Sequence, residues 1–357
     1  MNVLIAVLLL FSALGLADSL LGGKLGLAEE FEKGLSMMGS LALSMLGIYC
    51  FSITVTRAFP QAIAALSGVL PFDASLLVTS LLAPDLGGYS IARQMAGSAE
   101  EAVFSGVMVS SALGCTLSFA LPIALSSIAR ENAGDFLRGT VYGVVTLPVG
   151  LILGGLLAGA PPLTLAADLF PIVLLCALLC LAAVKAQKAT VKALTVFGGF
   201  VRALSAVLFA LVVFGMFVPE WNAVSSSLAA EALVIIVKIT VTVCGSLVLC
   251  RIVLRKFQPT LEALGAKIGV NSYSVVGLLL SLVSSVSMFT IFDRMDRKGK
   301  LLNAAFSVSA AFVFGGQMAF IASVEPWGVL MAYLAAKLAG GLAAAVFVVL
   351  KCRKESC

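Results

Sequence analysis

A carboxylate inside an apolar stretch is the first candidate for chemistry in this chain. Asp85 lies in the run Pro84-Asp85-Leu86-Gly87-Gly88, and an isolated carboxylate at membrane depth costs on the order of 3 kcal/mol. We interpret Asp85 as a counter-ion for a cationic substrate or as a proton site. The competing interpretation is an N-cap for a helix that starts near Tyr89. Gly87 and Gly88 either let a small ligand approach the backbone or only form the turn.

Hydroxyl, amide and ammonium groups supply the other candidates. Ser284 and Ser285 lie in a Ser-rich break and either bind a ligand or bond back to their own helix. Gln317 is an amide in an apolar setting that either lines a site or joins two helices. Lys337 lies in the middle of an apolar stretch, where it either pairs with a carboxylate, Asp85 or Asp296, or extends its stem toward water.

Several kinds of chemistry are excluded by what the sequence lacks. It has no His, no phosphate-binding Gly-Lys-Ser/Thr loop and no carboxylates at metal spacing. Most of the eight Cys lie in apolar runs and are typical of packed helices. We predict no enzyme activity, no catalytic residues, no cofactor and no metal. Any coupled proton would have to be carried by a carboxylate.

The composition predicts the elements that must position these residues. Apolar residues make up 61% of the 357 and charged residues only 11%, too few to cover a water-soluble domain. We predict an all-α polytopic membrane protein, a single transmembrane domain over 1–357, whose partner is the lipid bilayer. The net charge of +5 then indicates membrane orientation and not nucleic-acid binding, and a homo-oligomer stays open.

Spanning helices need about 20 apolar residues each. Two apolar stretches, 60–97 and 259–295, are too long for one span and contain helix breakers, so we expect each to form a re-entrant hairpin. If they cross the membrane instead, the chain has eleven spans. The nine clean spans are 2–21, 35–57, 101–128, 136–158, 169–187, 194–217, 228–254, 301–323 and 327–350.

The distribution of basic residues favours the hairpins. With the N-terminus outside and both hairpins re-entrant, all five basic clusters face the cytoplasm, as the positive-inside rule requires. If every stretch spans once, at least one cluster lies on the wrong side. The clusters are Arg130/Arg138, Lys185/Lys188/Lys192, Arg251/Arg255/Lys256/Lys267, Arg294/Arg297/Lys298/Lys300 and Lys351/Arg353/Lys354.

The same topology predicts an internal repeat. Each hairpin precedes two further spans, with Gly114 and Gly315 near equivalent depths, and the halves 1–158 and 193–350 are inverted about a linker helix at 169–187. Inverted repeats with broken helices are typical of secondary transporters, whose substrate sites lie near the midplane. We therefore expect the site where the tips at 84–88 and 284–287 meet.

Five segments spread along the chain form a recognisable pattern: Glu29-Glu30-Phe31-Glu32-Lys33-Gly34, Leu81-Leu82-Ala83-Pro84-Asp85-Leu86-Gly87-Gly88, Met295-Asp296-Arg297-Lys298-Gly299-Lys300, Phe306-Ser307-Val308-Ser309-Ala310-Ala311-Phe312 and Lys337-Leu338-Ala339-Gly340-Gly341. With these segments the chain resembles the EutH family of bacterial ethanolamine-utilisation membrane proteins, from about residue 29 to 350. This resemblance implies an inner-membrane transporter or facilitator for ethanolamine, a small protonated amine, and Tyr89 or Phe320 would add a cation–π contact.

The sequence departs from the family pattern at the expected site. Gly315-Gly316-Gln317 stands where the family carries Gly-Asp-His, and Ser284-Ser285 stands where it carries Asn-Asn. These changes keep two alternatives open. One is transport of another small polar or anionic solute paired with Lys337, and the other is a non-transporting membrane partner or sensor.

Overall fold

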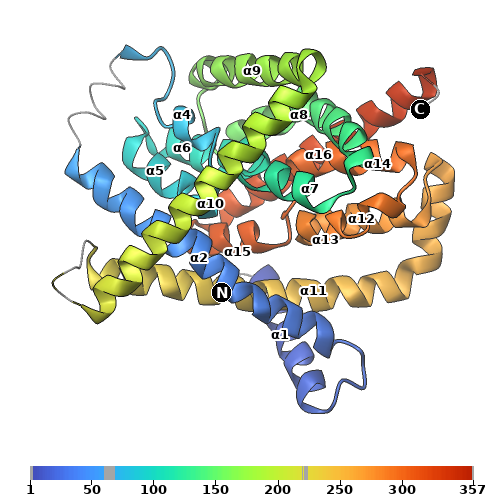
Figure 1. The fold of residues 1–357 in the computed structure, drawn as a ribbon, viewed down its shortest axis with the longest axis horizontal. Coiled ribbons are helices and arrows are strands. Elements are labelled where there is room, and N and C mark those ends of the chain that lie inside the picture. Colours follow the sequence, from blue (N-terminus) through green and yellow to red (C-terminus); the bar gives the residue numbers. More distant parts are fainter. Residues whose placement is uncertain (1–2, 60–68, 219, 221–223, 356–357) are drawn as a thin grey trace.

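The computed structural model describes residues 3–59, 69–218, 220 and 224–355 (Figure 1). All regular elements in these residues are helices. Seven of the described helical segments are long and apolar enough to cross a membrane, and Ile5–Leu20 and Ser272–Val283 are shorter apolar helices. The protein is therefore a multi-pass α-helical membrane protein, as its composition predicts.

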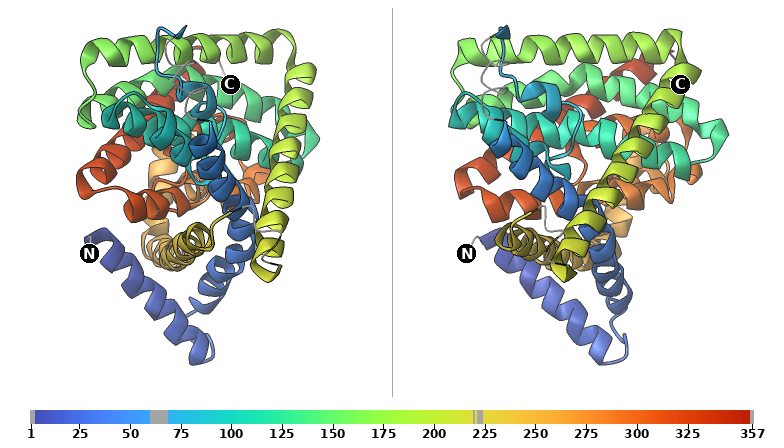
Figure 2. Two further views of the ribbon diagram at one scale, coloured as in Figure 1. Left: turned by 90° about the vertical axis from the view of Figure 1, so that its left-hand side faces the viewer. Right: turned by 60° about the vertical axis from the view of Figure 1, so that its left-hand side comes forward.

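Six long helices and the shorter α1 form the frame of the molecule. In Figure 1, α9 lies along the top, α10 crosses diagonally and α11 runs along the base, where it contains Pro259 and turns upward in its last part. Helix α1 hangs below α11 in both views of Figure 2. The helices are α1 (Val3–Leu20), α2 (Ala28–Ala58), α8 (Ala133–Leu157), α9 (Pro162–Lys185), α10 (Gln187–Phe217), α11 (Ser226–Ile268) and α16 (Trp327–Glu355).

Glycines bring several of these helices into close contact. A Cβ on Gly245 of α11 would overlap the carbonyl oxygen of Leu8 in α1, and one on Gly150 of α8 would lie 2.6 Å from the carbonyl oxygen of Ala336 in α16. Small residues let helix backbones approach and gain dispersion energy where lipid offers no hydrophobic drive. Gly150 therefore lies on the face of α8 that packs against α16.

The first broken unit follows the undescribed residues 60–68. Its first segment returns to its starting point, because the backbone N–H of Gly97 donates to the Asp73 carboxylate at 2.9 Å. A helical run from 99 to 127 follows, π-helical in its buried middle. The elements are α4 (Leu76–Thr79), η1 (Pro84–Leu86), α5 (Gly88–Met95), α6 (Ala99–Val103), η2 (Phe104–Gly114), η3 (Thr116–Ala120) and α7 (Leu121–Ser127).

The second broken unit closes in the same way. The backbone N–H of Asn271 donates to the Asp296 carboxylate at 2.8 Å, and the Ser274 hydroxyl donates to the same oxygen at 2.8 Å. The segment between them therefore also begins and ends at one place. The elements are α12 (Ser272–Val283), α13 (Ser285–Phe289), η6 (Phe292–Arg294), α14 (Arg297–Ala310) and α15 (Gly316–Val324).

Two expected boundaries are wrong. Residues 259–268 continue α11, so the second broken segment begins near Asn271 and not at 259. The expected span 301–323 is divided, because α14 ends at Ala310 and α15 begins at Gly316, with Phe312 at φ 62° between them. The freed backbone finds partners in the neighbouring broken helix: Phe312 N–H donates to Ser281 O at 3.0 Å and Phe314 N–H to Leu282 O at 2.8 Å.

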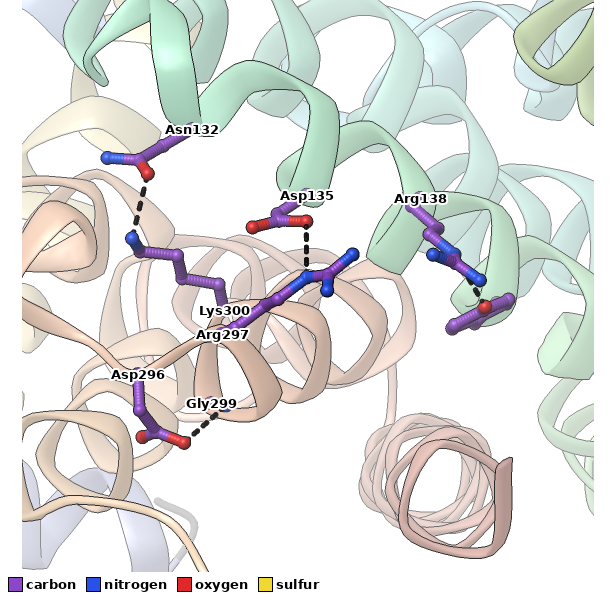
Figure 3. A network of polar contacts seen from close by, with 8 residues as sticks. Asn132, Asp135, Arg138, Asp296, Arg297, Gly299 and Lys300 are labelled. Atoms are coloured by element: carbon purple, nitrogen blue, oxygen red, sulfur yellow. Dashed lines mark hydrogen bonds and ion pairs between the residues drawn. The ribbon is translucent and has the colours of Figure 1, made fainter. Parts of the chain in front are cut away.

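Polar contacts join the two broken units at both ends. The far end of α7 meets the start of α14, where the backbone N–H of Ala129 donates to Asp293. Figure 3 shows two further contacts of α14 nearby: Lys300 donates to Asn132 at 2.7 Å, and Arg297 lies 3.4 Å from Asp135 at the start of α8. At the opposite end Glu325, just after α15, accepts a hydrogen bond from Tyr89 of α5 at 2.8 Å and lies 4.0 Å from Arg93. The end of each unit therefore contacts the beginning of the other.

Candidate functional site

A cavity lies where the broken helices cross. Its volume of about 70 Å³ is room for a few water-sized groups. Side chains from both broken units line it together with residues of α2 and α11, so it depends on helices that are far apart in the sequence. The lining residues are Met37, Ser40, Leu41, Asp85, Cys115, Phe119, Val243, Val283, Ser284, Phe312, Gly316 and Gln317.

Asp85 reaches this cavity from the one-turn helix η1. Ala83 is extended before it and Gly87 after it has φ 93°, a left-handed conformation that favours glycine. Two serines of the following helical run hydrogen-bond the backbone at this break. Ser118 Oγ accepts from Ala83 N–H at 3.1 Å, and Ser110 Oγ donates to Leu82 O at 2.6 Å. These bonds satisfy backbone groups that lipid could not.

The Asp85 carboxylate forms no ion pair with another described residue. It contacts its own backbone N–H, and no ion pair within 4.0 Å joins it to a cation in the described part of the chain. The alternative interpretation as a helix cap fails, because Gly87 is the N-cap of α5 and no side chain caps it. The carboxylate is thus half-buried on the cavity wall, with no cation at contact distance among the described residues.

Ser284 comes from the second break and lies on the same cavity. It has extended backbone between α12 and α13 and its side chain is buried. Ser285 is also fully buried, but its Oγ has no hydrogen-bond partner in the described residues and it is not among the lining residues. The break thus turns one of the two expected hydroxyls toward Asp85's cavity.

Gln317 and Lys337 form a buried pair beside the cavity. Gln317 lies in the first turn of α15 and lines the cavity. Lys337, on α16, contacts Gln317 but does not line the cavity. Lys337 Nζ donates to Gln317 Oε1 and to Ser111 O, each at 2.8 Å. Both alternatives for Lys337 are therefore wrong: it pairs with neither Asp85 nor Asp296, and at 3% exposed it does not reach water. Asp296 instead caps α14 through Gly299 N–H.

Three further candidates, Gly87, Gly88 and Tyr89, do not line the cavity. A Cβ on Gly87 would lie 2.5 Å from Ile48, and one on Gly88 would overlap Ser110 Oγ, so both glycines serve close packing. The Tyr89 ring packs edge-on against Phe320 with centroids 5.5 Å apart, and its hydroxyl is taken by Glu325. Neither ring lines the cavity where a bound amine would meet Asp85.

Sequence reasoning missed most of the remaining wall. Met37 and Ser40 of α2 carry no sequence signal that separates them from other residues of a spanning helix. Cys115 fits the packed-helix interpretation, yet its thiol also lines the cavity. Phe312 lines it because its left-handed backbone turns the ring toward Phe119, at 5.8 Å between centroids.

The arrangement combines one carboxylate with neutral polar groups on a largely apolar wall. Such a site suits a small cation that carries a second polar group, since the carboxylate offsets the charge and the hydroxyl and amide fix orientation. Among the described residues no group of three or more His, Cys, Asp or Glu could hold a metal ion.

Comparison with known proteins gives the family. The model of the family described as "Ethanolamine utilisation protein, EutH" matches residues 1–350. A Listeria monocytogenes protein named probable ethanolamine permease EutH is 30% identical over 96% of this chain and 92% of its own length. A Bacillus subtilis protein named uncharacterized protein YxeR is 29% identical over 96% of this chain and 93% of its own.

A more distant relative agrees with these. The Salmonella typhimurium protein named probable ethanolamine permease EutH is 26% identical over 89% of this chain and 84% of its own length. No solved structure matches the chain. The match extends over the hairpin segments, the broken spans and the cavity described above, and the chain belongs to the EutH family of membrane proteins.

Proposed function

We propose that this protein transports ethanolamine, or a similar small protonated amine, across the bacterial plasma membrane. The ammonium group binds Asp85 in the cavity at the crossing of the broken helices, with Ser284 and Gln317 as neutral polar neighbours. The relatives' names, probable ethanolamine permease, support the substrate. The observation that carries the proposal is that an unpaired carboxylate lines a small cavity which both broken units build.

The two broken units support a transporter with inverted repeats, in halves 1–158 and 193–350. Each begins with a segment closed by a carboxylate, Asp73 or Asp296, and each end contacts the start of the other. In both units a glycine of the following helix packs on a carbonyl at the break: Gly114 on Leu82 and Gly315 on Val283. Such repeats form sites near the midplane that open alternately to the two sides.

Helix length supports re-entrant segments within these repeats. Helix α12 has 12 residues, which extend about 18 Å at 1.5 Å per residue, against a hydrocarbon core of about 30 Å. Because Asn271 and Asp296 are hydrogen-bonded to each other, the chain enters and leaves at one side. The equivalent contact between Asp73 and Gly97 gives the first segment the same form.

The charges at the two ends support an orientation. The end where α7 meets α14 carries several basic residues, Arg294, Arg297 and Lys300 among them, and the opposite end carries Glu325 and Glu100. The positive-inside rule places the basic end in the cytoplasm. In this orientation the N-terminus is outside, and acidic residues lie on the side from which a cation would enter.

An anionic solute is less well supported. Lys337 would have to bind it, but its ammonium already donates to two acceptors and does not line the cavity. The carboxylate on the wall would repel an anion. Nothing in the described residues favours a sensor or binding partner over a transporter.

The test is uptake of labelled ethanolamine into proteoliposomes at mildly acidic pH, where little neutral amine crosses lipid. We expect saturable uptake that Asp85→Asn lowers at least about 100-fold, because a charge-assisted contact in a low-dielectric site is lost. Glu131→Gln, an exposed acid, is the matched control and should transport normally. Normal transport by Asp85→Asn contradicts the binding role, and no uptake by the folded wild type contradicts the function.

A further inference from the structure

We infer that the side-chain amide N–H of Gln317 donates a hydrogen bond to the hydroxyl oxygen of the substrate. We infer also that Lys337 holds the amide in the orientation that this hydrogen bond requires. The inference rests on the proposed function, because it assigns the second half of the molecule whose ammonium binds Asp85. Under this inference Gln317, and not Asp85, is the residue that discriminates amino alcohols from plain alkylamines.

Lys337 determines which end of the Gln317 amide faces the cavity. An ammonium group has only N–H donors and no lone pair, so the amide must present its oxygen to it, and the two atoms lie 2.8 Å apart. The ammonium is itself fixed by Ser111 O at 2.8 Å and lies 5.5 Å from the Tyr333 ring centroid. Tyr333 is held in turn by its hydrogen bond to Phe312 O at 3.1 Å.

The amide nitrogen is therefore turned away from Lys337, and it is left without a partner. Gln317 is 3% exposed and its Nε2 has no hydrogen-bond partner in the described residues. Buried donors are rarely left unpaired, because their lost hydration is not repaid. Its polar neighbour in the cavity is the Cys115 thiol, which is only a weak acceptor. An oxygen acceptor in the cavity would satisfy the amide.

The charges assign complementary roles to the two ends of the ligand. Asp85 can only attract a cation and the Gln317 NH₂ can only donate, so the cavity fits an ammonium at one end and an oxygen acceptor at the other. Lys337 already donates to the amide oxygen of Gln317 on that side of the cavity, and the only carboxylate among the described residues that line the cavity is Asp85. One orientation of the amino alcohol is therefore favoured, with its ammonium at Asp85 and its oxygen at the amide.

The experiment compares two amines that differ by one hydroxyl. Unlabelled ethanolamine and ethylamine compete with labelled ethanolamine for uptake, and the ratio of their half-inhibitory concentrations measures hydroxyl recognition. We expect the wild type to prefer ethanolamine by about tenfold, the size of one well-placed hydrogen bond. Gln317→Met, of similar length but without a donor, should abolish this preference while ethylamine competes as in the wild type.

Two further variants separate recognition from packing. Gln317→Glu keeps the acceptor for Lys337 but has no N–H, so it should also lose the preference. Lys337→Met frees the amide to rotate and should lower the preference although the residue does not touch the substrate. Gln94→Met, the same change at an exposed glutamine of α5, should leave the ratio unchanged.

The outcomes distinguish the inference from the function beneath it. A Gln317→Met protein that still prefers ethanolamine as the wild type does overturns the role of the amide. A wild type that transports both amines without preference also overturns it while the proposed transport stands. A folded wild type that transports neither amine removes the proposed function itself.

Discussion

The first and second broken segments are built alike but carry different chemistry. Each is closed by a carboxylate that accepts backbone N–H groups, at Asp73 and at Asp296. At its tip the first segment places a charge, Asp85, on a one-turn helix, whereas the second places a hydroxyl, Ser284, on extended backbone. Two segments that are closed in the same way thus present different side chains to one cavity, a carboxylate from the first and a hydroxyl from the second.

The largest expected effects come from the glycines that seat each break. A Cβ on Gly315 or on Gly114 would overlap the carbonyl oxygen of Val283 or of Leu82, and backbone cannot give way as a flexible side chain does. We expect Gly315→Ala and Gly114→Ala each to cost about 2–4 kcal/mol of stability, measured as thermal unfolding in detergent. Gly39→Ala, where a Cβ meets nothing within 4 Å, is the control. If only one glycine matters, the breaks are not equivalent.

The next effect concerns the serines that satisfy the broken backbone. Ser110 donates to Leu82 O at 2.6 Å in the first break, and Ser246 donates to Phe314 O at 2.6 Å in the second. Ser110→Ala and Ser246→Ala should each cost about 1–2 kcal/mol, because a buried carbonyl then lacks its donor. The same unfolding assay measures both. Loss of less than about 0.3 kcal/mol at either position would mean that another donor replaces the hydroxyl.

A smaller effect should separate the two serines of the second tip. Ser284 lines the cavity and Ser285 does not, so Ser284→Ala should raise the half-saturating ethanolamine concentration about threefold, the size of one weak neutral contact. Ser285→Ala should leave that concentration unchanged, because its hydroxyl has no partner to lose. The reverse result would place the substrate on the other side of α13.

The smallest effect is expected at the ion pair between α14 of the second broken unit and the start of α8. The Arg297–Asp135 pair at 3.4 Å is partly exposed, and such pairs contribute at most about 0.5–1 kcal/mol. Asp135→Asn should therefore lower stability slightly in low salt and less in high salt, as measured by thermal unfolding. A large, salt-independent loss would show that this end of the molecule depends on more than charge.

Much of the fold could be predicted from the chain alone. Leu81 to Gly88 combines Pro84 with Gly87 and Gly88, and the helix is broken at these residues. The family resemblance is confirmed by the match over residues 1–350. Membrane class followed from composition, because a chain with so few charged residues cannot cover a soluble surface. The first helix break depends on local sequence and the membrane class on composition, so neither requires knowledge of the tertiary structure.

The second unit was predicted less well, for a physical reason. Residues 306–312 read as an uninterrupted helix, and no proline marks the break after Ala310. The break forms because Phe312 and Phe314 donate to carbonyls of α12, and Ser246 and Tyr333 donate to the carbonyls of the same two residues. These partners are far apart in sequence, so neither periodicity nor propensity contains them.

The sequence by itself determined that this protein lies in a membrane and where its first helix break falls, and it made Asp85, at that break, the candidate binding carboxylate. Those features follow from hydropathy and from proline and glycine, whose effects are local. Only the tertiary structure decided that Lys337 contacts Gln317 and not Asp85, and that Gln317, Ser284 and Asp85 share one cavity. A buried polar group chooses its partner by which helices cross at its depth, and helix crossing is a property of the whole chain.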